Sequence, residues 1–358
     1  MRALLAYASV TMATAMALAL PITLVGGCGT KDEGPPLTDC SAAEPSAKQV
    51  DLQLTPKHCG ACGHNCEAGT CVSGKCQPGV FAAGQSGAFA IVSDKDTVYW
   101  TNATSGAVMR SPKSAASGAA VEIAKGQNKP QGIALDDTGV YWTQNADNGA
   151  IMEIAKSATT GGTPVKIADA KSSLAIAVDV TSVYYTTAAG ELIKAPLSGV
   201  VAATLQSGLS NPRAIAVDSN NVYFVLGGSG SDGALMKYAI ASSGPAAPLA
   251  SNLQAPAGVV VDATDAYVSS KGGILKIALS AGGATVTLGP ASGTPDGIAV
   301  DDQDVYWVNP SEGTVMKVSK QGGTPVTVAS GQKSPHGIVV DSKAIFWTTD
   351  GAVMKLLR

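Results

Sequence analysis

A short sequence pattern recurs seven times between residue 88 and the C-terminus, and it constrains the fold more than any other feature of the chain. Each copy begins with a small residue followed by Ile-Ala-Val-Asp or a close variant. A short turn, Val-Tyr-Trp or a close variant, a polar loop and a segment like Gly-x-Val-Met-Lys then follow in that order. The aspartates are Asp94, Asp136, Asp179, Asp218, Asp262, Asp301 and Asp341, and the aromatics five positions later are Tyr99, Tyr141, Tyr184, Tyr223, Tyr267, Tyr306 and Phe346. Successive aspartates lie 39 to 44 residues apart. This is the period of a four-stranded blade in a β-propeller.

Alternation and turn residues divide each copy into four short strands. In the second copy, we expect these strands at residues 132–136, 140–144, 150–154 and 164–168. The seventh copy ends at Arg358 after three strands, whereas residues 80–85, before the first copy, resemble the fourth strand and exit loop at residues 326–332. We therefore predict an all-β fold, a seven-bladed β-propeller of four-stranded blades over residues 79–358, closed by an N-terminal strand that completes the last blade.

Positions that repeat in every copy are expected to be structural. The residue four positions before each aspartate is Ala or Gly, which suits seven inner strands that converge on one axis. The tryptophans Trp100, Trp142, Trp307 and Trp347 share one position and are expected to fill the core between blades. The seven aspartates are expected to accept hydrogen bonds within their own turns, and their repetition argues against a unique catalytic role.

The first 28 residues resemble a bacterial lipoprotein signal. Arg2 gives a short positive start, residues 3–25 are mostly apolar, and Gly26, Gly27 and Cys28 follow. We interpret residues 1–27 as a signal peptide and the Cys28 thiol as the acceptor of diacylglycerol. A plain secretory signal or an uncleaved membrane helix is the alternative. The resemblance implies a lipid-anchored protein of the bacterial cell envelope, in the outer membrane, at its periplasmic face or at the cell surface.

A tether and a small cysteine-rich module are expected to separate the lipid from the propeller. Residues 28–57 are rich in Pro, Ser, Lys and Asp without apolar periodicity, which is typical of a tether without fixed structure. Residues 58–78, together with Cys40, supply the remaining cysteines: Cys40, Cys59, Cys62, Cys66, Cys71 and Cys76. An even set in an exported chain predicts three disulfides, whose pairing the sequence leaves open. The alternative is a metal knuckle, because Cys59 and Cys62 have CxxC spacing beside His58 and His64.

Composition and motifs argue against several functional classes. Charged residues make up 14% of the chain and the formal net charge is -3, so no basic field is present to attract nucleic acid. The sequence contains no nucleotide-binding loop or HExxH zinc helix, and no Ser-His-Asp set can be placed. We therefore expect no nucleic-acid partner and no cofactor.

The Pro-x-Gly-Ile-Ala-Val-Asp and Val-Tyr-Trp-Thr signatures resemble those of the NHL and YWTD class of β-propellers, over residues 79–358. The cysteine-rich stretch likewise resembles the small modules that precede repeat domains in some bacterial surface lipoproteins. The propeller resemblance implies a fold and leaves function open, because the class includes receptor modules, protein-binding scaffolds, sugar-lactone hydrolases and an antibiotic-cleaving lyase. YWTD propellers usually have six blades, whereas seven copies are present here. The hydrolases need a metal and the lyase needs histidines around the central mouth.

Neither catalytic set of that class can be transferred to this chain. The propeller has one histidine, His336, and its few glutamates, Glu122, Glu153, Glu191 and Glu312, fall in expected outer strands or loops. Asp296 and His336 lie in adjacent copies and could share a metal, but no third ligand is evident. We therefore assign no catalytic and no metal-binding residues.

One position varies where its neighbours repeat, and this makes it the best guide to a binding site. Directly before each small residue come Phe89, Gln131, Leu174, Arg213, Ala257, Asp296 and His336, which we call the rim residues because they should surround one mouth of the channel. We predict that Gln131, Arg213, Asp296 and His336 bind a ligand, for instance a carboxylate, a sugar or a peptide end. The alternative is that they are solvated loop residues.

These patterns favour a non-catalytic envelope lipoprotein whose propeller is a binding or protein-interaction scaffold. The alternative is a propeller enzyme, either a metal-dependent lactonase-like hydrolase or a lyase-like protein. The expected partners are the membrane, through the lipid anchor, and an envelope protein or a small polar ligand. We expect the propeller to be monomeric.

Overall fold

The computed structural model describes residues 37–358 except 45, 48, 63, 64, 68, 116–118, 200, 229, 243, 281–283, 291 and 292. The predicted signal peptide, the lipidated Cys28 and the first part of the tether lie outside these residues. Among the residues that are described, no helix is long and apolar enough to cross a membrane.

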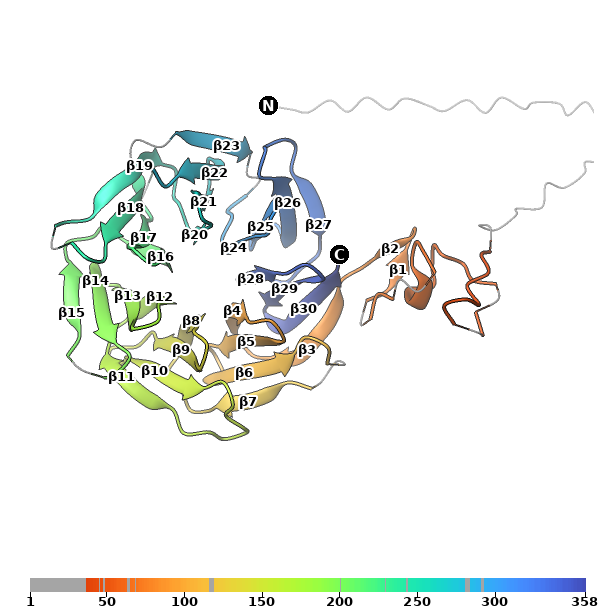
Figure 1. Cartoon of the computed structure of the whole chain (residues 1–358), viewed down its shortest axis with the longest axis horizontal. Helices are drawn as coiled ribbons and strands as arrows, with labels where there is room; N and C mark the ends of the chain where they lie inside the picture. Colours follow the sequence, from red (N-terminus) through yellow and green to blue (C-terminus); the bar gives the residue numbers. More distant parts are fainter. Residues whose placement is uncertain are drawn as a thin grey trace, which may run out of the picture. The chain divides into compact units, whose positions relative to one another are not determined.

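Seven antiparallel four-stranded sheets form a ring, as predicted (Figure 1). Blade 1 comprises β4 (Ala88–Ser93), β5 (Thr97–Asn102), β6 (Ala107–Pro112) and β7 (Val121–Ala124); blade 2 comprises β8 (Pro130–Leu135), β9 (Gly139–Gln144), β10 (Ala150–Ala155) and β11 (Val165–Asp169). Blade 3 comprises β12 (Ser173–Val178), β13 (Ser182–Thr187), β14 (Glu191–Pro196) and β15 (Ala203–Gln206); blade 4 comprises β16 (Pro212–Val217), β17 (Asn221–Leu226), β18 (Gly233–Ala239) and β19 (Ala247–Leu253). Blade 5 comprises β20 (Gly258–Val261), β21 (Asp265–Ser270), β22 (Gly273–Ala278) and β23 (Thr285–Gly289); blade 6 comprises β24 (Ile298–Val300), β25 (Asp304–Asn309), β26 (Thr314–Ser319) and β27 (Val326–Ala329). Blade 7 comprises β28 (Ile338–Val340), β29 (Ala344–Thr349), β30 (Gly351–Leu357) and β3 (Gly79–Gln85).

The N-terminal strand closes the ring, which confirms the prediction from the repeats. Strand β3 pairs antiparallel with β30, so that the first and last parts of the propeller share the sheet of blade 7. The Phe81 ring of β3 packs edge-on against Phe346, with ring centroids 5.1 Å apart. The Thr348 hydroxyl of blade 7 also donates to the Phe89 carbonyl of blade 1, at 2.6 Å. Pairing both termini in one sheet removes an exposed edge.

Close approach of the inner strands explains the repeated small residues. A Cβ on Gly297 would lie 2.2 Å from the His336 carbonyl oxygen of the next blade, a distance that van der Waals contact forbids. The four tryptophans are fully buried, as predicted for the core between blades. The indole N–H groups of Trp100, Trp142 and Trp347 donate to the side chains of Gln85, Gln127 and Gln332. These bonds satisfy polar groups that burial would otherwise penalise.

Each inner strand ends in a turn built around its aspartate. In blade 5, Asp262 Oδ1 accepts from the N–H groups of Thr264 and Asp265, at 3.0 and 2.9 Å, and Oδ2 accepts from the Tyr267 hydroxyl at 2.9 Å. The backbone bonds recur in the other six blades. The tyrosine bond recurs in five of them, while blade 7 has Phe346. The predicted structural role is therefore confirmed. We call the face that carries these turns the turn face.

A second repeated position on the turn face links neighbouring blades. In four blades the residue after the third strand is a cation that pairs with the turn aspartate of the preceding blade. The pairs are Lys113–Asp341 at 2.7 Å, Lys156–Asp94 at 3.3 Å, Lys320–Asp262 at 2.8 Å and Arg358–Asp301 at 2.5 Å. In blades 3, 4 and 5 the position holds Leu197, Ile240 and Leu279, which pack against the apolar core. The ring therefore has four ion-paired and three apolar blade interfaces.

The cysteine-rich module contains three disulfides and is larger than the sequence predicts. The bonds are Cys40–Cys62, Cys59–Cys71 and Cys66–Cys76. A 3-10 turn (η1, Pro56–His58) and a hairpin of β1 (Cys71–Val72) and β2 (Lys75–Cys76) complete it. The sequence predicts a tether without fixed structure up to residue 57, but Thr38 forms a β-bridge with Val50, and the Gly60 N–H donates to the Leu52 carbonyl. The folded module therefore begins near Leu37 and not at residue 58, because the Cys40–Cys62 disulfide holds the chain around Cys40 against the rest of the module.

Candidate functional site

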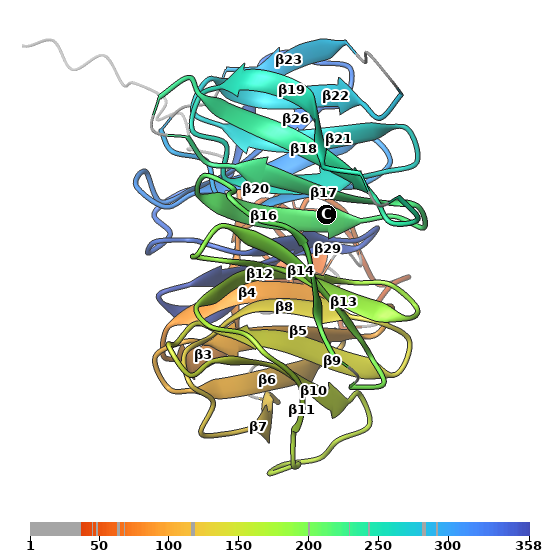
Figure 2. The same cartoon turned by 90° about the vertical axis from the view of Figure 1, so that its left-hand side faces the viewer.

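The rim residues lie at the start of the inner strands, at the opposite end from the turns. Figure 2 shows the ring from the side, with the strands running across its thickness, so the two ends of an inner strand reach opposite faces. We call the face that carries the rim residues the rim face. The turn residues and the rim residues therefore cannot act in one site.

Hydroxyl groups on the second strands fix the backbone of the rim. In blade 1, Thr101 Oγ1 accepts from the Ala90 N–H at 3.2 Å and donates to the Gln131 carbonyl of blade 2 at 2.7 Å. Equivalent bonds hold two other rim residues. The Thr186 hydroxyl donates to the Arg213 carbonyl at 3.2 Å, and the Ser269 hydroxyl donates to the Asp296 carbonyl at 2.7 Å. Each rim residue held in this way has its backbone fixed by the neighbouring blade, while its side chain can vary.

Two of the predicted site residues contact each other, and another is engaged elsewhere. His336 Nδ1 lies 3.3 Å from Asp296 Oδ2, and the His336 ring lies 5.1 Å from the ring of Phe89, the rim residue of blade 1. Gln131 Oε1 instead accepts a hydrogen bond from Asn145 Nδ2 at 3.0 Å, within its own blade. Among the described residues, the Gln131 side chain therefore bonds to Asn145 and not to the other predicted site residues.

The structure brings Arg213 and Asp296 together in a cavity of about 350 Å³ on the rim face. We call this cavity the rim pocket. Its lining comes from the rim positions, from the segments that lead into the inner strands of blades 5 and 6, and from the loops between the second and third strands of blades 4, 5 and 6: Arg213, Gly227, Gly228, Ala255, Ala257, Lys271, Thr294, Pro295, Asp296 and Pro310. Its volume is at the lower end of the range of small-molecule sites.

The charged groups of the rim pocket have few partners of their own. Neither the Arg213 guanidinium nor the Lys271 ammonium forms an ion pair or side-chain hydrogen bond with the described part of the chain, and both residues are exposed. Asp296 uses Oδ2 towards His336, and 39% of its side chain is exposed. The pocket therefore offers two cations and one carboxylate to a ligand.

Small residues make room for these groups. Ala257 is the rim residue between Arg213 and Asp296, and its side chain is a single methyl group. A Cβ on Gly227 would lie 2.9 Å from Arg213 Nε, so the arginine lies across a position that has no side chain.

A larger cavity, of about 1200 Å³, lies on the turn face between blades 7 and 1. Its lining includes Lys113 and Asp341, which pair with each other, and Lys355, which pairs with Glu67 of the cysteine-rich module. The Lys355 side chain is 7% exposed and also donates to the Lys113 carbonyl at 2.8 Å. Because these charges already neutralise one another, we assign the cavity to the closure of the ring rather than to ligand binding.

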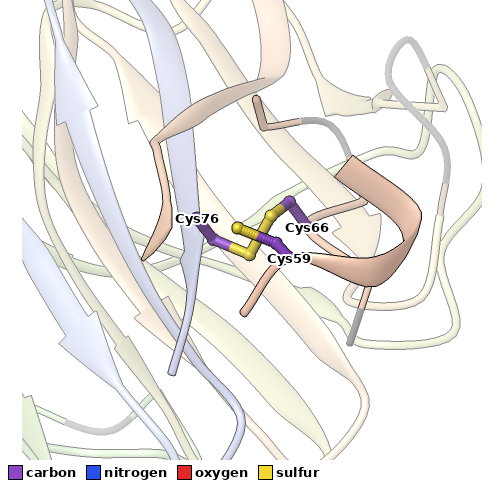
Figure 3. A group of neighbouring side chains, drawn as sticks. All are labelled: Cys59, Cys66 and Cys76. Carbon is purple, nitrogen blue, oxygen red and sulfur yellow. A yellow bond between two sulfur atoms is a disulfide. The ribbon is translucent and has the colours of Figure 1, made fainter. Parts of the chain in front are cut away.

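The cysteine-rich module contains the one close group of metal-ligand atoms found among the described residues. The sulfur atoms of Cys59, Cys66 and Cys76 lie within 4.8 Å of one another (Figure 3). Cys66 is bonded to Cys76, and Cys59 to Cys71, so these sulfurs are not thiolates. Cys62 of the CxxC pair is bonded to Cys40. The pairing supports crosslinks over the metal-knuckle alternative. His64 of that alternative lies outside the described residues.

Electrostatic shifts concentrate on the turn face. Burial raises the pKa of Asp262, but hydrogen bonds from the Lys320 ammonium and from the turn N–H groups outweigh this and hold the pKa far below its usual range. Burial and turn hydrogen bonds oppose each other in the same way at the other six aspartates, and the pKa of each is lowered. Charged carboxylates are therefore part of the folded turns.

Comparison with solved structures identifies the fold. The chain is similar to a streptogramin B lyase, with a TM-score of 0.66 and 14% identity over 78% of this chain and 97% of that one. It is similar to a catalytically inactive virginiamycin B lyase from Staphylococcus aureus with quinupristin, with a TM-score of 0.65 and 17% identity over 79% and 98% of the two chains. It is also similar to a chain of a nidogen/laminin complex, with a TM-score of 0.53 and 19% identity over 68% and 97%. At these identities the likeness shows the β-propeller fold alone.

No known protein family and no curated protein matches the sequence. The class that fold and site define is therefore a seven-bladed β-propeller preceded by a disulfide-bonded module, with a charged pocket on its rim face.

Sequence reasoning missed Lys271 and the blade-linking cations. Lys271 lies in a loop outside the repeated pattern, so nothing in the sequence joined it to Arg213. The cations were detectable, because Lys113, Lys156, Lys320 and Arg358 occupy one register of the repeat. Their alternation with Leu and Ile at that position is the signal that could have identified a contact between blades.

Proposed function

We propose that the protein is a non-catalytic binding protein of the cell envelope, and that its rim pocket holds a small ligand with a carboxylate group. The observation that carries this proposal is the convergence of Arg213 and Lys271 in one cavity of about 350 Å³, where neither forms an ion pair with an acidic side chain of the described residues. A guanidinium fork and an ammonium group are the side chains best suited to a carboxylate. The predicted site at Arg213, Asp296 and His336 is retained in this proposal, and Gln131 is placed at its margin.

Calorimetric titration of the purified mature protein with a panel of small carboxylates tests the proposal. We expect at least one compound to bind and the Arg213→Ala, Lys271→Ala double variant to weaken its binding by at least about 30-fold, since each lost charge-assisted contact costs about 1 kcal/mol or more. Lys333→Ala is the matched control, because Lys333 is an exposed lysine in the loop before His336 and does not line the pocket. Equal loss of binding in the control variant, or no loss in the double variant, contradicts the proposal.

We place the protein on the membrane through a lipid on Cys28, following the signal-like sequence of residues 1–27. The test is metabolic labelling with an alkyne fatty acid, followed by membrane fractionation of the wild type and of Cys28→Ser. We expect the label and the outer-membrane location to be lost in the variant. A labelled or still sedimenting variant contradicts the anchor.

A second candidate is a lyase-like enzyme, favoured by the His336–Asp296 pair on the rim face and by the fold shared with streptogramin B lyases. Incubation with quinupristin separates the two candidates. We expect no cleavage, because the described propeller contains one histidine and its Nδ1 faces Asp296. Cleavage by the wild type that His336→Ala abolishes would establish the enzyme instead.

A further inference from the structure

The rim pocket carries charges of both signs on different blades. Arg213 belongs to blade 4, Lys271 follows the second strand of blade 5, and Asp296 belongs to blade 6. A simple anion site would gain nothing from a carboxylate in its wall, because like charges repel and would weaken binding. The position of Asp296 therefore says something about the ligand beyond its negative charge.

Asp296 is held in place with one oxygen unused. Its carbonyl accepts from the Ser269 hydroxyl at 2.7 Å, and its N–H donates to the Val308 carbonyl at 2.9 Å. Oδ2 faces His336 Nδ1 at 3.3 Å, whereas Oδ1 accepts no hydrogen bond from the described residues. A fixed carboxylate with a free oxygen in a pocket is an acceptor for a charged N–H donor.

Arg213 has the complementary arrangement. Its carbonyl accepts from Thr186 at 3.2 Å, which fixes the backbone, and its side chain lies beside Gly227, where a Cβ would be 2.9 Å from Nε. The guanidinium has five donors and no described acceptor, so it can bind both oxygens of a carboxylate. Lys271 adds a second positive charge to the same lining.

The rest of the lining limits the size and polarity of the occupant. Ala255, Ala257, Pro295 and Pro310 are small or rigid and largely apolar. Together with a volume of about 350 Å³, they suit a ligand with a short or apolar substituent between its charged groups.

We infer that the rim pocket binds a zwitterion, a molecule with the ammonium and carboxylate groups of a free α-amino acid or a dipeptide. The carboxylate binds Arg213 and Lys271, and the ammonium group binds Oδ1 of Asp296. This inference rests on the proposed function and deepens it. A dicarboxylate would face Asp296, an amine without a carboxylate would face two cations, and a neutral sugar would bring no opposite charge to any of the three groups.

The test uses five probes that differ in their charged groups: alanine, alanyl-alanine, N-acetylalanine, alaninamide and propionate. Calorimetric titration of the purified mature protein measures their affinities. We expect alanine or alanyl-alanine to bind most tightly, and N-acetylalanine, alaninamide and propionate each to bind at least about tenfold more weakly, the equivalent of about 1.4 kcal/mol. A preference for alanyl-alanine over alanine would set the length of the ligand.

Variants identify the group that recognises each charge. Asp296→Asn keeps the shape of the side chain and should reduce the ratio of alanine to propionate affinity to near one, whereas Arg213→Ala should weaken both probes. Ala257→Leu should block the pocket to every probe, while Lys333→Ala, at an exposed lysine that does not line the pocket, should change nothing. Thermal melting of each variant shows that it is folded.

The outcomes separate the inference from the proposed function. If propionate binds as tightly as alanine and needs Arg213, the pocket is a carboxylate site and the zwitterion inference is overturned alone. If no probe binds, the inference is overturned, and failure of the wider carboxylate panel removes the proposed function as well. If alanine binds but Asp296→Asn leaves the alanine-to-propionate ratio unchanged, Asp296 does not recognise the ammonium group.

Discussion

The two ends of the inner strands differ in how strictly the chain repeats. On the turn face, all seven blades place a charged aspartate in the same hydrogen-bonded turn, with the pKa lowered in each. On the rim face, the seven equivalent side chains are all different, and only the backbone around them is held by recurring bonds. The comparison teaches that one end of each strand stabilises the ring, whereas the side chains at the other end are free to vary.

The largest expected effect comes from removing the strand that both ends of the propeller share. Deletion of residues 79–85 exposes the edge of β30 and removes Phe81 from the core of blade 7. We expect aggregation, or a broad thermal transition at a much lower temperature, because an unpaired edge and a lost buried aromatic act together. Calorimetry and light scattering measure this. An unchanged melting curve would show that closure contributes little.

Acid is expected to weaken the turn face. The folded pKa of each turn aspartate lies below its value in the unfolded chain, about 3.9, so the stabilisation is complete above that value and is lost as the pH falls through the folded pKa. We expect the free energy of unfolding to fall by on the order of several kcal/mol between pH 6 and pH 3. Urea titrations across this range provide the measurement.

The apolar interfaces sharpen this prediction. Within the described part of the chain, Asp136, Asp179 and Asp218 pair with no cation from the next blade, whereas Asp262 pairs with Lys320. As the pH is lowered, the protection factors of the amides in the turns of blades 2 to 4 should therefore fall at a higher pH than those in the turn of blade 5. If the protection factors fall first in blade 5, the ion pair between Lys320 and Asp262 does not control the titration of Asp262.

A single substitution on each face tests the comparison directly. Asp262→Ala removes acceptors for two backbone N–H groups, for the Tyr267 hydroxyl and for Lys320. We expect a loss of about 2–3 kcal/mol of unfolding free energy, because hydrogen bonds to a charged group are broken and Tyr267 is left unsatisfied. Asp296→Asn on the rim face is the matched control and should change stability by less than about 0.5 kcal/mol. If both variants lose a similar amount of unfolding free energy, the two faces do not differ in their contribution to stability.

The sequence predicts the fold well because each blade repeats the same local chemistry. Asp262 with Tyr267 shows this, since a turn acceptor and its donor five residues later need no knowledge of distant contacts. The rim pocket is different. Arg213 and Asp296 share a variable position that the repeats identify, but Lys271 joins them only through the folding of a loop, and Gln131 turns to Asn145 instead of the pocket. Side-chain direction at a variable position depends on neighbours that a repeat does not encode.

The same reason explains the boundary of the cysteine-rich module. The composition of residues 28–57 is that of a tether, and the sequence alone leaves the partner of Cys40 open. Once Cys40 is joined to Cys62, the chain around Thr38 and Val50 is held close enough to form its β-bridge. A long-range crosslink therefore overrides local composition.

The smallest expected effect comes from converting an ion-paired interface into an apolar one. Lys320 is 11% exposed, and blades 3, 4 and 5 show that Leu or Ile fits the equivalent position. Lys320→Leu should change the free energy of unfolding at pH 7 by less than about 1 kcal/mol, because the lost attraction is offset by removing a largely buried charge and adding apolar contact.

The variant should nevertheless raise the pKa of Asp262, since the ammonium group that helps to lower it is gone. Protection of the amides in the blade 5 turn should then respond to acid at the same pH as in blade 4, because the next blade has Leu279, and no cation, at the position equivalent to Lys320. Lys333→Leu, an exposed lysine outside these interfaces, should leave the acid response of blade 5 unaltered. A loss of several kcal/mol at pH 7 would instead mean that the four cations are needed for the ring to form, and that the two kinds of interface are not interchangeable.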